Sequence, residues 1–367
     1  MNRIKSVNLV FLATVLMSVG GSFVISFLTN YTDNYFIVLL LSQIFLVIPS
    51  AVYLITQNVN LAQAIRFKSI RVSNVILIII FAYLIIPLMN FINALSMLFV
   101  KDNITGLMYN IVSNNGFLLS LIMIALIPCI LEESVYRGIF YNEYRKVSPL
   151  KGVFLSAFLF GIIHGNLNQF SYAFAMGIIF ALLIEATDSI LSTMITHFII
   201  NASSVLLMYL YPIMIKTLEA VYGSEQFNAD ELIKSMESGA IENIDLGYVI
   251  KSYGITALVA TILAFFVFRT IAKNSGRWEH VKSIFRGKAS ESAVNYSETE
   301  YYTDDGDISL ASNFYEKPAK RRLLSVSLII AILICIALLI GNELDATDTT
   351  KESVEEFYAI AGLLPVK

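Results

Sequence analysis

The sequence predicts an all-α, polytopic integral membrane protein, a bundle of about 9 transmembrane helices with its N-terminus inside and its C-terminus outside. The first observation is composition: 57% of the residues are hydrophobic and only 14% are charged, which is far from an average soluble domain. The second is that nine stretches are apolar over the roughly 20 residues that a helix needs to cross a bilayer. The third is that the segments that connect these stretches alternate along the chain between basic segments and acidic or neutral ones.

We expect the spans near residues 8–28, 35–55, 73–99, 117–134, 150–165, 169–185, 189–212, 246–270 and 323–341. Arg3 and Lys5 precede the first span, and the segments after the second, fourth and eighth spans are also basic. Because basic loops stay in the cytoplasm, this pattern sets the orientation. The first span also has features of a signal peptide, but it has no clear Ala-x-Ala site, so we favour an uncleaved anchor.

The connecting segments divide the chain further. We expect N-terminal spans in 1–115, a core with the polar motifs in 116–212, an acidic extracytoplasmic loop in 213–245, a span in 246–270, a cytoplasmic and partly disordered linker in 271–322, a final span in 323–342 and an acidic tail in 343–367. Within the loop, Ala229–Glu237 suits a short amphipathic helix. The polar segment 286–320 is a spacer or a docking segment for a membrane or cytoplasmic protein, and the last span looks like an appendage.

Cysteine content and net charge exclude several classes of protein. The two cysteines, Cys129 and Cys335, lie in apolar segments, which argues against a disulfide framework or a cysteine-based metal site. The net charge of -3 is too small to indicate a nucleic-acid partner. The partners that the composition does suggest are membrane lipids.

Three short polar clusters interrupt otherwise apolar helices. Ionisable groups at membrane depth are costly and usually face a cavity or a partner, so each cluster is a candidate functional site. The clusters are Glu132-Glu133 with Arg137, Phe160 with His164, and His197 with Asn201.

The first cluster supplies two carboxylates for which we expect different roles. Glu133 and Arg137 are four residues apart with the acid first, which favours an ion pair on one helix face. Glu132 points about 100° away around the helix and has no obvious partner, so it suits a general base. The alternative is that all three charges simply mark the water interface at a helix end.

The other two clusters place histidines beside a ring and an amide. Phe160 and His164 share one helix face, so the ring packs the imidazole and excludes water, although such a histidine alone is more often a core residue. His197 and Asn201 also share a face and offer two hydrogen-bond donors to a developing oxyanion. An interhelical polar contact is the alternative for this pair.

The depth of the clusters sets a condition on the site. In a hairpin that turns at Ser148-Pro149, Glu133 and His164 lie at equal depth, whereas His197 lies deeper toward the cytoplasm by on the order of 12 Å. The clusters therefore meet only if residues 165–168 lie inside the membrane or the connection 185–188 is re-entrant. Such irregular backbone is tolerated where protein or a cavity surrounds it.

The three clusters resemble the motifs of the CPBP family, also called the Abi or CAAX-protease-and-bacteriocin-processing family of intramembrane proteases, over about residues 115–210. The resemblance implies that Glu132 and His164 activate water and that His197 and Asn201 stabilise the oxyanion, with Glu133, Arg137 and Phe160 in supporting positions. The family is often labelled a metalloprotease family, and a zinc ion held by Glu132, His164 and His197 is plausible chemistry. Since no HExxH pair is present, we slightly prefer a metal-free mechanism.

The leading hypothesis is therefore an intramembrane endopeptidase with a cavity open to the cytoplasmic side or laterally to lipid. Its substrates would be prenylated or otherwise lipid-anchored tails, leader peptides or membrane-protein segments, in a prokaryotic plasma membrane. One alternative is a catalytically silent scaffold or regulator of the same fold. Another is a transporter with a proton relay, although we find no matching pair of broken helices.

Overall fold

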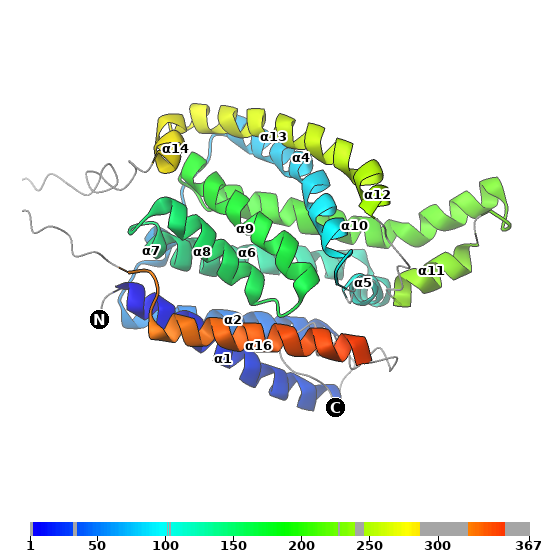
Figure 1. Cartoon of the computed structure of the whole chain (residues 1–367), viewed down its shortest axis with the longest axis horizontal. Coiled ribbons are helices and arrows are strands. Elements are labelled where there is room, and N and C mark those ends of the chain that lie inside the picture. Colours follow the sequence, from blue (N-terminus) through cyan, green and yellow to red (C-terminus); the bar gives the residue numbers. More distant parts are fainter. Residues whose placement is uncertain are drawn as a thin grey trace, which may run out of the picture.

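The computed structural model describes residues 3–31, 35–100, 102, 104–226, 228–238, 246–286 and 322–348, and the regular structure in these ranges is helical throughout (Figure 1). This confirms the predicted fold class. The elements are α1 Arg3–Thr29, α2 Tyr35–Thr56, α3 Leu61–Ala64, α4 Val72–Ser96, α5 Thr105–Ser120, η1 Leu121–Leu126, α6 Ile127–Glu133, η2 Ser134–Tyr141, α7 Asn142–Tyr144, α8 Pro149–Ile162, α9 Leu167–Thr187, α10 Leu191–Tyr222, α11 Ala229–Ser238, α12 Leu246–Val249, η3 Ile250–Gly254, α13 Ile255–Asn274, α14 Trp278–Phe285 and α16 Val326–Asp348.

The described residues contain 8 helices, or continuous runs of helices, that are long and apolar enough to cross a membrane. The protein is thus a multi-pass membrane bundle, in agreement with the expected fold of about nine spans. The apolar helix α8, expected as a span at 150–165, has 14 residues and is not among the 8. At 1.5 Å per residue it is about 21 Å long, against a hydrocarbon core of about 30 Å.

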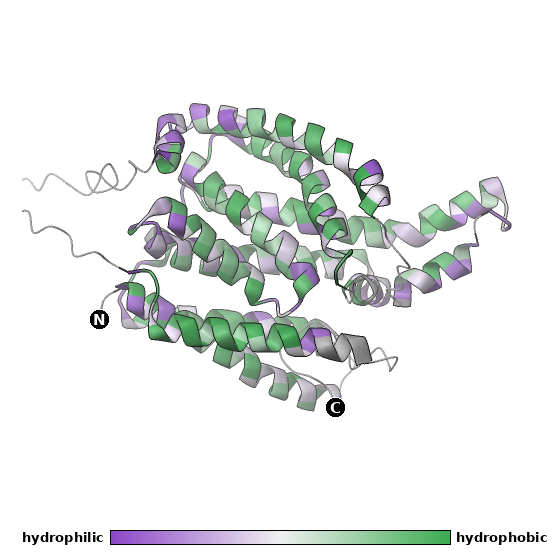
Figure 2. Ribbon diagram, viewed as in Figure 1, coloured by the Kyte–Doolittle hydropathy of each residue, from purple (hydrophilic) through white to green (hydrophobic). Residues whose placement is uncertain are grey.

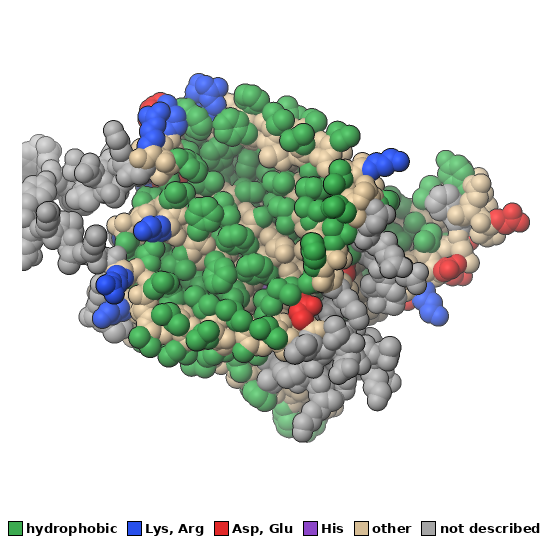
Figure 3. Space-filling view, in the orientation of Figure 1, with side chains coloured by type: hydrophobic (Ala, Val, Ile, Leu, Met, Phe, Trp, Pro, Cys, Tyr) green, Lys and Arg blue, Asp and Glu red, His purple; other side chains and the backbone are tan. Residues whose placement is uncertain are grey.

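Hydrophilic residues gather at the two ends of the bundle, and the helices between them are mostly apolar (Figure 2). What we call the basic end, at the left of Figure 3, carries Arg3, Lys68, Arg71, Arg145, Lys151, Arg277, Lys282 and Arg322. What we call the acidic end carries Asp102, Glu219, Glu225, Glu231, Glu237 and Glu343, alongside Lys216, Lys234 and Lys251. The expected amphipathic helix of the loop is present there as α11.

The last span is part of the bundle and not the appendage that we expected. Helix α16 lies beside α1 (Figure 1), and its Leu328 and Ala331 are fully buried. At the basic end the buried Asn8 of α1 donates from Nδ2 to the Leu323 carbonyl at 2.7 Å and to Ser325 Oγ at 2.9 Å. Of the linker segment proposed for partner docking, 286–320, only Arg286 lies within the described residues.

Helices α8 and α9 form a tight antiparallel hairpin that enters the bundle from the basic end and returns to it. A Cβ atom on Gly177 would lie only 2.6 Å from the Cα atom of Ala157, so the two backbones touch here and only glycine fits. Small residues allow this close approach between membrane helices. The hairpin turns at Gly165, whose φ of 63° is a left-handed conformation that glycine adopts without strain.

Residues 105–144 form one nearly continuous helical run with two irregular features. Gly116, with φ 74° and ψ 170°, breaks the run into two helices, next to residue 117, where we expected the fourth span to start. Two π-helical stretches, η1 and η2, flank the short α6 that carries Glu132 and Glu133. Such widened turns occur frequently at functional sites.

Candidate active site

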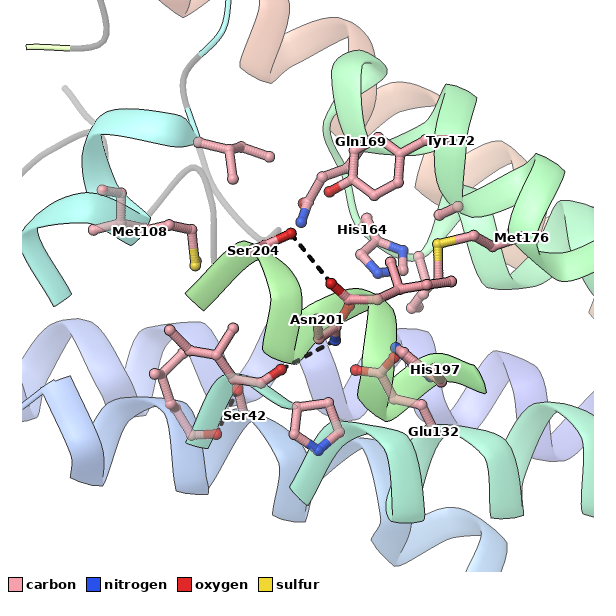
Figure 4. A pocket seen from close by; sticks show the side chains of 18 of the residues that line it. Ser42, Met108, Glu132, His164, Gln169, Tyr172, Met176, His197, Asn201 and Ser204 are labelled. Atoms are coloured by element: carbon pink, nitrogen blue, oxygen red, sulfur yellow. Dashed lines mark hydrogen bonds between the residues drawn. The ribbon is translucent and has the colours of Figure 1, made fainter. Parts of the chain in front are cut away.

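One cavity of about 410 Å³ is lined by Glu132, His164, His197 and Asn201 (Figure 4). Glu132 comes from the end of α6, His164 from the turn after α8, and His197 and Asn201 from one face of α10. The structure therefore brings together the four side chains that the sequence suggested as catalytic. It does so from three separate parts of the chain.

Glu132 is half-buried at the cavity wall and has a partner that the sequence analysis did not identify. Gln43 of α2 donates from Nε2 to Glu132 Oε1 at 3.1 Å. The signal for Gln43 was present, because a lone amide in an otherwise apolar span is itself a functional candidate. The contact orients the Glu132 carboxylate and leaves it beside the cavity.

Behind the cavity wall, Glu133 joins Arg137 to His197. Its side chain is 0% exposed, and its Oε1 accepts a hydrogen bond from Arg137 Nη1 at 3.0 Å, the ion pair expected from the sequence. The same Oε1 lies 3.0 Å from Nδ1 of His197. Because a carboxylate only accepts, His197 Nδ1 carries the hydrogen, and Nε2 holds a lone pair in the neutral ring. Glu133 also stabilises the ring when both nitrogens are protonated.

His164 is fixed in the same tautomer by its own helix end. Its Nδ1 lies 2.7 Å from the carbonyl oxygen of Phe160, which can only accept, so the basic nitrogen of the neutral ring is Nε2. The imidazole packs edge-on against the Phe160 ring with centroids 5.2 Å apart. Phe160 also contacts the His197 ring, at 6.2 Å, and lies 4.1 Å from the Arg137 guanidinium carbon. This one ring therefore packs between both histidines.

The turn that carries His164 is held from outside the hairpin. Asn342, near the end of α16, donates from Nδ2 to the Gly165 carbonyl at 2.8 Å, and Glu343 Oε1 accepts from the Leu167 N–H at 3.4 Å. Ser96 of α4 donates to Asn168 Oδ1 at 3.1 Å. The turn is thus buried in the bundle, where protein surrounds its irregular backbone.

Asn201 is positioned by a proline on the facing helix. Pro128 has no N–H, so the carbonyl of Ile124, four residues earlier, loses its usual helical donor. Asn201 Nδ2 donates to this Ile124 oxygen at 3.0 Å. One of the two amide hydrogens of Asn201 is therefore used to fix the side chain, and the other remains for the cavity. The sequence analysis had counted Asn201 as a donor without this constraint.

The residues do not fit a zinc site. Within the described residues, no group of three or more His, Cys, Asp or Glu side chains is arranged to hold a metal ion. Glu132, His164 and His197 line the same cavity, but they do not form such a group, whereas a catalytic zinc site has three protein ligands. We therefore derive no step through a metal.

Comparison with known proteins gives one match. Residues 114–203 match the family model described as "Type II CAAX prenyl endopeptidase Rce1-like", and this range contains all three polar clusters. The match confirms the family resemblance seen in the motifs, and at the level of the family it indicates a membrane protease. No curated protein and no solved structure matches the chain.

Proposed function

We propose that this protein is an intramembrane endopeptidase that hydrolyses peptide bonds of membrane-associated polypeptides. The observation that carries the proposal is the convergence of Glu132, His164, His197 and Asn201 on one cavity within the bundle. A carboxylate, two oriented imidazoles and an amide are the groups that water activation and oxyanion stabilisation require. A scaffold has no need to gather them around a cavity.

In the proposed reaction, a water molecule lies between Glu132 and His164. The Glu132 carboxylate takes a proton from this water, and the oxygen of the water attacks the carbonyl carbon of the substrate. His164 accepts a hydrogen bond from the water at Nε2, because its Nδ1 is committed to the Phe160 carbonyl. The C–N bond then breaks, and the proton passes from Glu132 to the departing amine.

The oxyanion that forms in this step receives two hydrogen bonds. The second amide hydrogen of Asn201 is one donor, since the first is bonded to Ile124. The other is Nε2–H of His197 in its doubly protonated form, whose positive charge is opposed by the Glu133 carboxylate on the far side of the ring. Donors aimed at a developing negative charge typically contribute about 10²–10³-fold each.

The substrates that we propose are prenylated or otherwise lipid-anchored tails, leader peptides or segments of membrane proteins. The apolar lining of the cavity, which includes Leu39, Met123 and Met176, suits such segments. We place the protein in the plasma membrane of a prokaryotic cell, because the family resemblance and the compact loops favour that setting.

The test is cleavage of a fluorogenic peptide library by the detergent-purified full chain. The library contains farnesylated CAAX-type peptides and leader-type peptides. We expect cleavage by the wild type and a loss of about 10²–10⁴-fold in Glu132→Gln, the range typical for a general base. Glu132→Gln keeps the size of the side chain, so its fold should be unchanged.

The matched control is Glu279→Gln on α14, the same chemical change on a side chain that is 79% exposed. This control should cleave like the wild type. Activity that persists in Glu132→Gln would exclude Glu132 as the base. If the folded wild type cleaves neither class of peptide, the result would count against the proposed activity.

A further inference from the structure

The side of the membrane to which the cavity opens can be read from its lining. On α2 and α4 the lining residues fall in the half that is remote from the basic end. On α2 they are Val38–Leu46, near its start, and the basic connection with Lys68 and Arg71 follows its end. On α4 they are Met89–Asn93, near its end, and Arg71 precedes its start. The two helices run in opposite directions, and the lining residues of both lie away from the basic end.

The hairpin agrees with α2 and α4. On α9 the lining residues are Asn168–Met176, while Glu185 at the other end of the helix is bonded to Arg145 of the basic end. On α10, which starts at Leu191 after the Lys68 partner Asp188, they run from His197 to Met208 and so include the first half of that helix. The cavity therefore reaches the depth of His197 on α10, while its lining on α2, α4 and α9 lies toward the acidic end.

The two ends of the cavity lining give the same direction. The lining extends to Asp102, in the connection between α4 and α5 at the acidic end, and to Thr105, the first residue of α5. Toward the basic end the cavity is closed by packed side chains: Tyr136 is 1%, Arg137 2% and Phe160 2% exposed. A peptide that arrives from the basic end would have to displace these side chains.

The positive-inside rule places the basic end in the cytoplasm. We infer that the active-site cavity opens on the extracytoplasmic side, and that the substrates are exported polypeptides or extracytoplasmic segments of membrane proteins. This inference rests on the proposed function and narrows its substrate class. It excludes cytoplasmic lipid-anchored tails, and it reverses our expectation from the sequence of a cavity open to the cytoplasm or to lipid.

Charge in the cavity restricts the substrate further. Its described lining contains two carboxylates, Glu132 and Asp102, and no lysine or arginine. The lining also includes side-chain amides such as those of Asn90, Asn93 and Gln169, which can pair with the backbone of an extended peptide. A segment with neutral or basic residues around the scissile bond suits this lining, because a carboxylate there would face like charges.

Cysteine labelling in intact cells tests the direction without any need for catalysis. The two native cysteines are buried and are first replaced by alanine. Single cysteines are then introduced as Ser204→Cys, in the cavity (Figure 4), and Glu279→Cys, on α14 at the basic end. We expect a membrane-impermeant maleimide to label Ser204→Cys in intact cells and Glu279→Cys only after permeabilisation. The opposite pattern would overturn the inference, as would a Ser204→Cys that stays unlabelled in permeabilised cells.

A pair of reporters separates this inference from the proposed function. The same cleavable segment is tethered to a membrane anchor on the outer side in one reporter and on the inner side in the other. We expect cleavage of the outer reporter alone, and its loss in Glu132→Gln. Glu132-dependent cleavage of the inner reporter alone would support the protease function and contradict the extracytoplasmic opening of the cavity. If Ser204→Cys is labelled from outside and neither reporter is cleaved, the result would support the extracytoplasmic opening and count against the protease function.

Discussion

Two buried carboxylates of this protein have similar surroundings and different positions. Glu133 and Glu185 are both 0% exposed, and each is bonded to an arginine and a histidine. The histidine of Glu133 is His197, which lines the candidate active-site cavity. Neither Glu185 nor its histidine, His280, is among the described residues of that lining. The difference teaches that a buried ion pair with a histidine indicates a candidate site only where a cavity lies next to it.

The partners of Glu185 show what such a cluster does elsewhere. Tyr141 donates to its Oε1 at 2.8 Å, Arg145 to its Oε2 at 2.7 Å, and His280 Nε2 lies 2.6 Å from Oε2. Arg277 also donates to its backbone carbonyl at 2.7 Å. These contacts tie α9 to η2, to the turn after α7 and to α14, so Glu185 joins the elements of the basic end. Its role is structural.

The largest expected contrast between the two clusters is in activity. Glu133→Gln removes the charge that orients and stabilises His197, and outer partners of a functional histidine are typically worth about 10–100-fold. We expect kcat to fall by that factor in the peptide assay. Glu185→Gln, the same substitution at the other cluster, should leave kcat of the folded protein unchanged. Equal losses in both variants would show that the cavity does not distinguish the clusters.

The second contrast is in stability. Glu185→Gln leaves several cationic side chains at the basic end without their shared carboxylate, and loss of one partner of a buried ion pair costs about 3–5 kcal/mol. We expect the lower end of this range, because Arg145 and Arg277 are partly exposed. Chemical unfolding in detergent micelles measures the change. An unaltered unfolding midpoint would mean that Glu185 does not hold the basic end together.

Short-range helical spacing explains why the sequence predicted one cluster and not the other. Glu133 and Arg137 are neighbours on one helix, so their pairing follows from the four-residue interval. Glu185 lies 44 residues from Tyr141 and 95 from His280 in the chain. A pairing between segments so far apart depends on the packing of the whole bundle, which no local pattern encodes.

The same limit explains the other differences. The apolar run at 150–165 was predicted as a span because its hydropathy is high, whereas α8 has only 14 residues between its start at Pro149 and the turn at Gly165. Asn201 was expected to be an oxyanion donor together with His197, and its bond to Ile124 was not foreseen, since the missing donor at Pro128 matters only once α6 and α10 are in contact. The side chains that line the cavity could be named from residue types and intervals, whereas their contacts with α2 and α16 depend on how the whole bundle packs.

A smaller effect is expected at Asn342, the support from α16. Asn342→Ala removes the hydrogen bond to the Gly165 carbonyl and leaves that oxygen unsatisfied, which costs about 1–3 kcal/mol. Because this turn carries His164, we also expect kcat to fall, by less than the roughly 10²-fold that a 1 Å misplacement can cost. The unfolding midpoint and the peptide assay measure the two effects.

The matched control for Asn342 is Asn74→Ala, another buried asparagine, which bonds Ser275 and Asn274 at the basic end. Asn74→Ala should lower stability by a similar amount and leave kcat unchanged. If Asn342→Ala also leaves kcat unchanged, α16 stabilises the bundle without positioning His164. The position of His164 would then depend on the α8–α9 hairpin and not on α16.

The smallest effect is expected at His280, the counterpart of His197. In His280→Ala, Glu185 keeps Tyr141 and Arg145 and loses one hydrogen bond, so we expect a loss of about 0.5–1.5 kcal/mol in unfolding free energy. The kcat should not change, whereas His197→Ala should abolish measurable cleavage, because it removes an oxyanion donor and leaves Glu133 without its link to the cavity. A fall in kcat for His280→Ala at unchanged stability would mean that the basic end communicates with the site, and the separation between the two clusters would no longer hold.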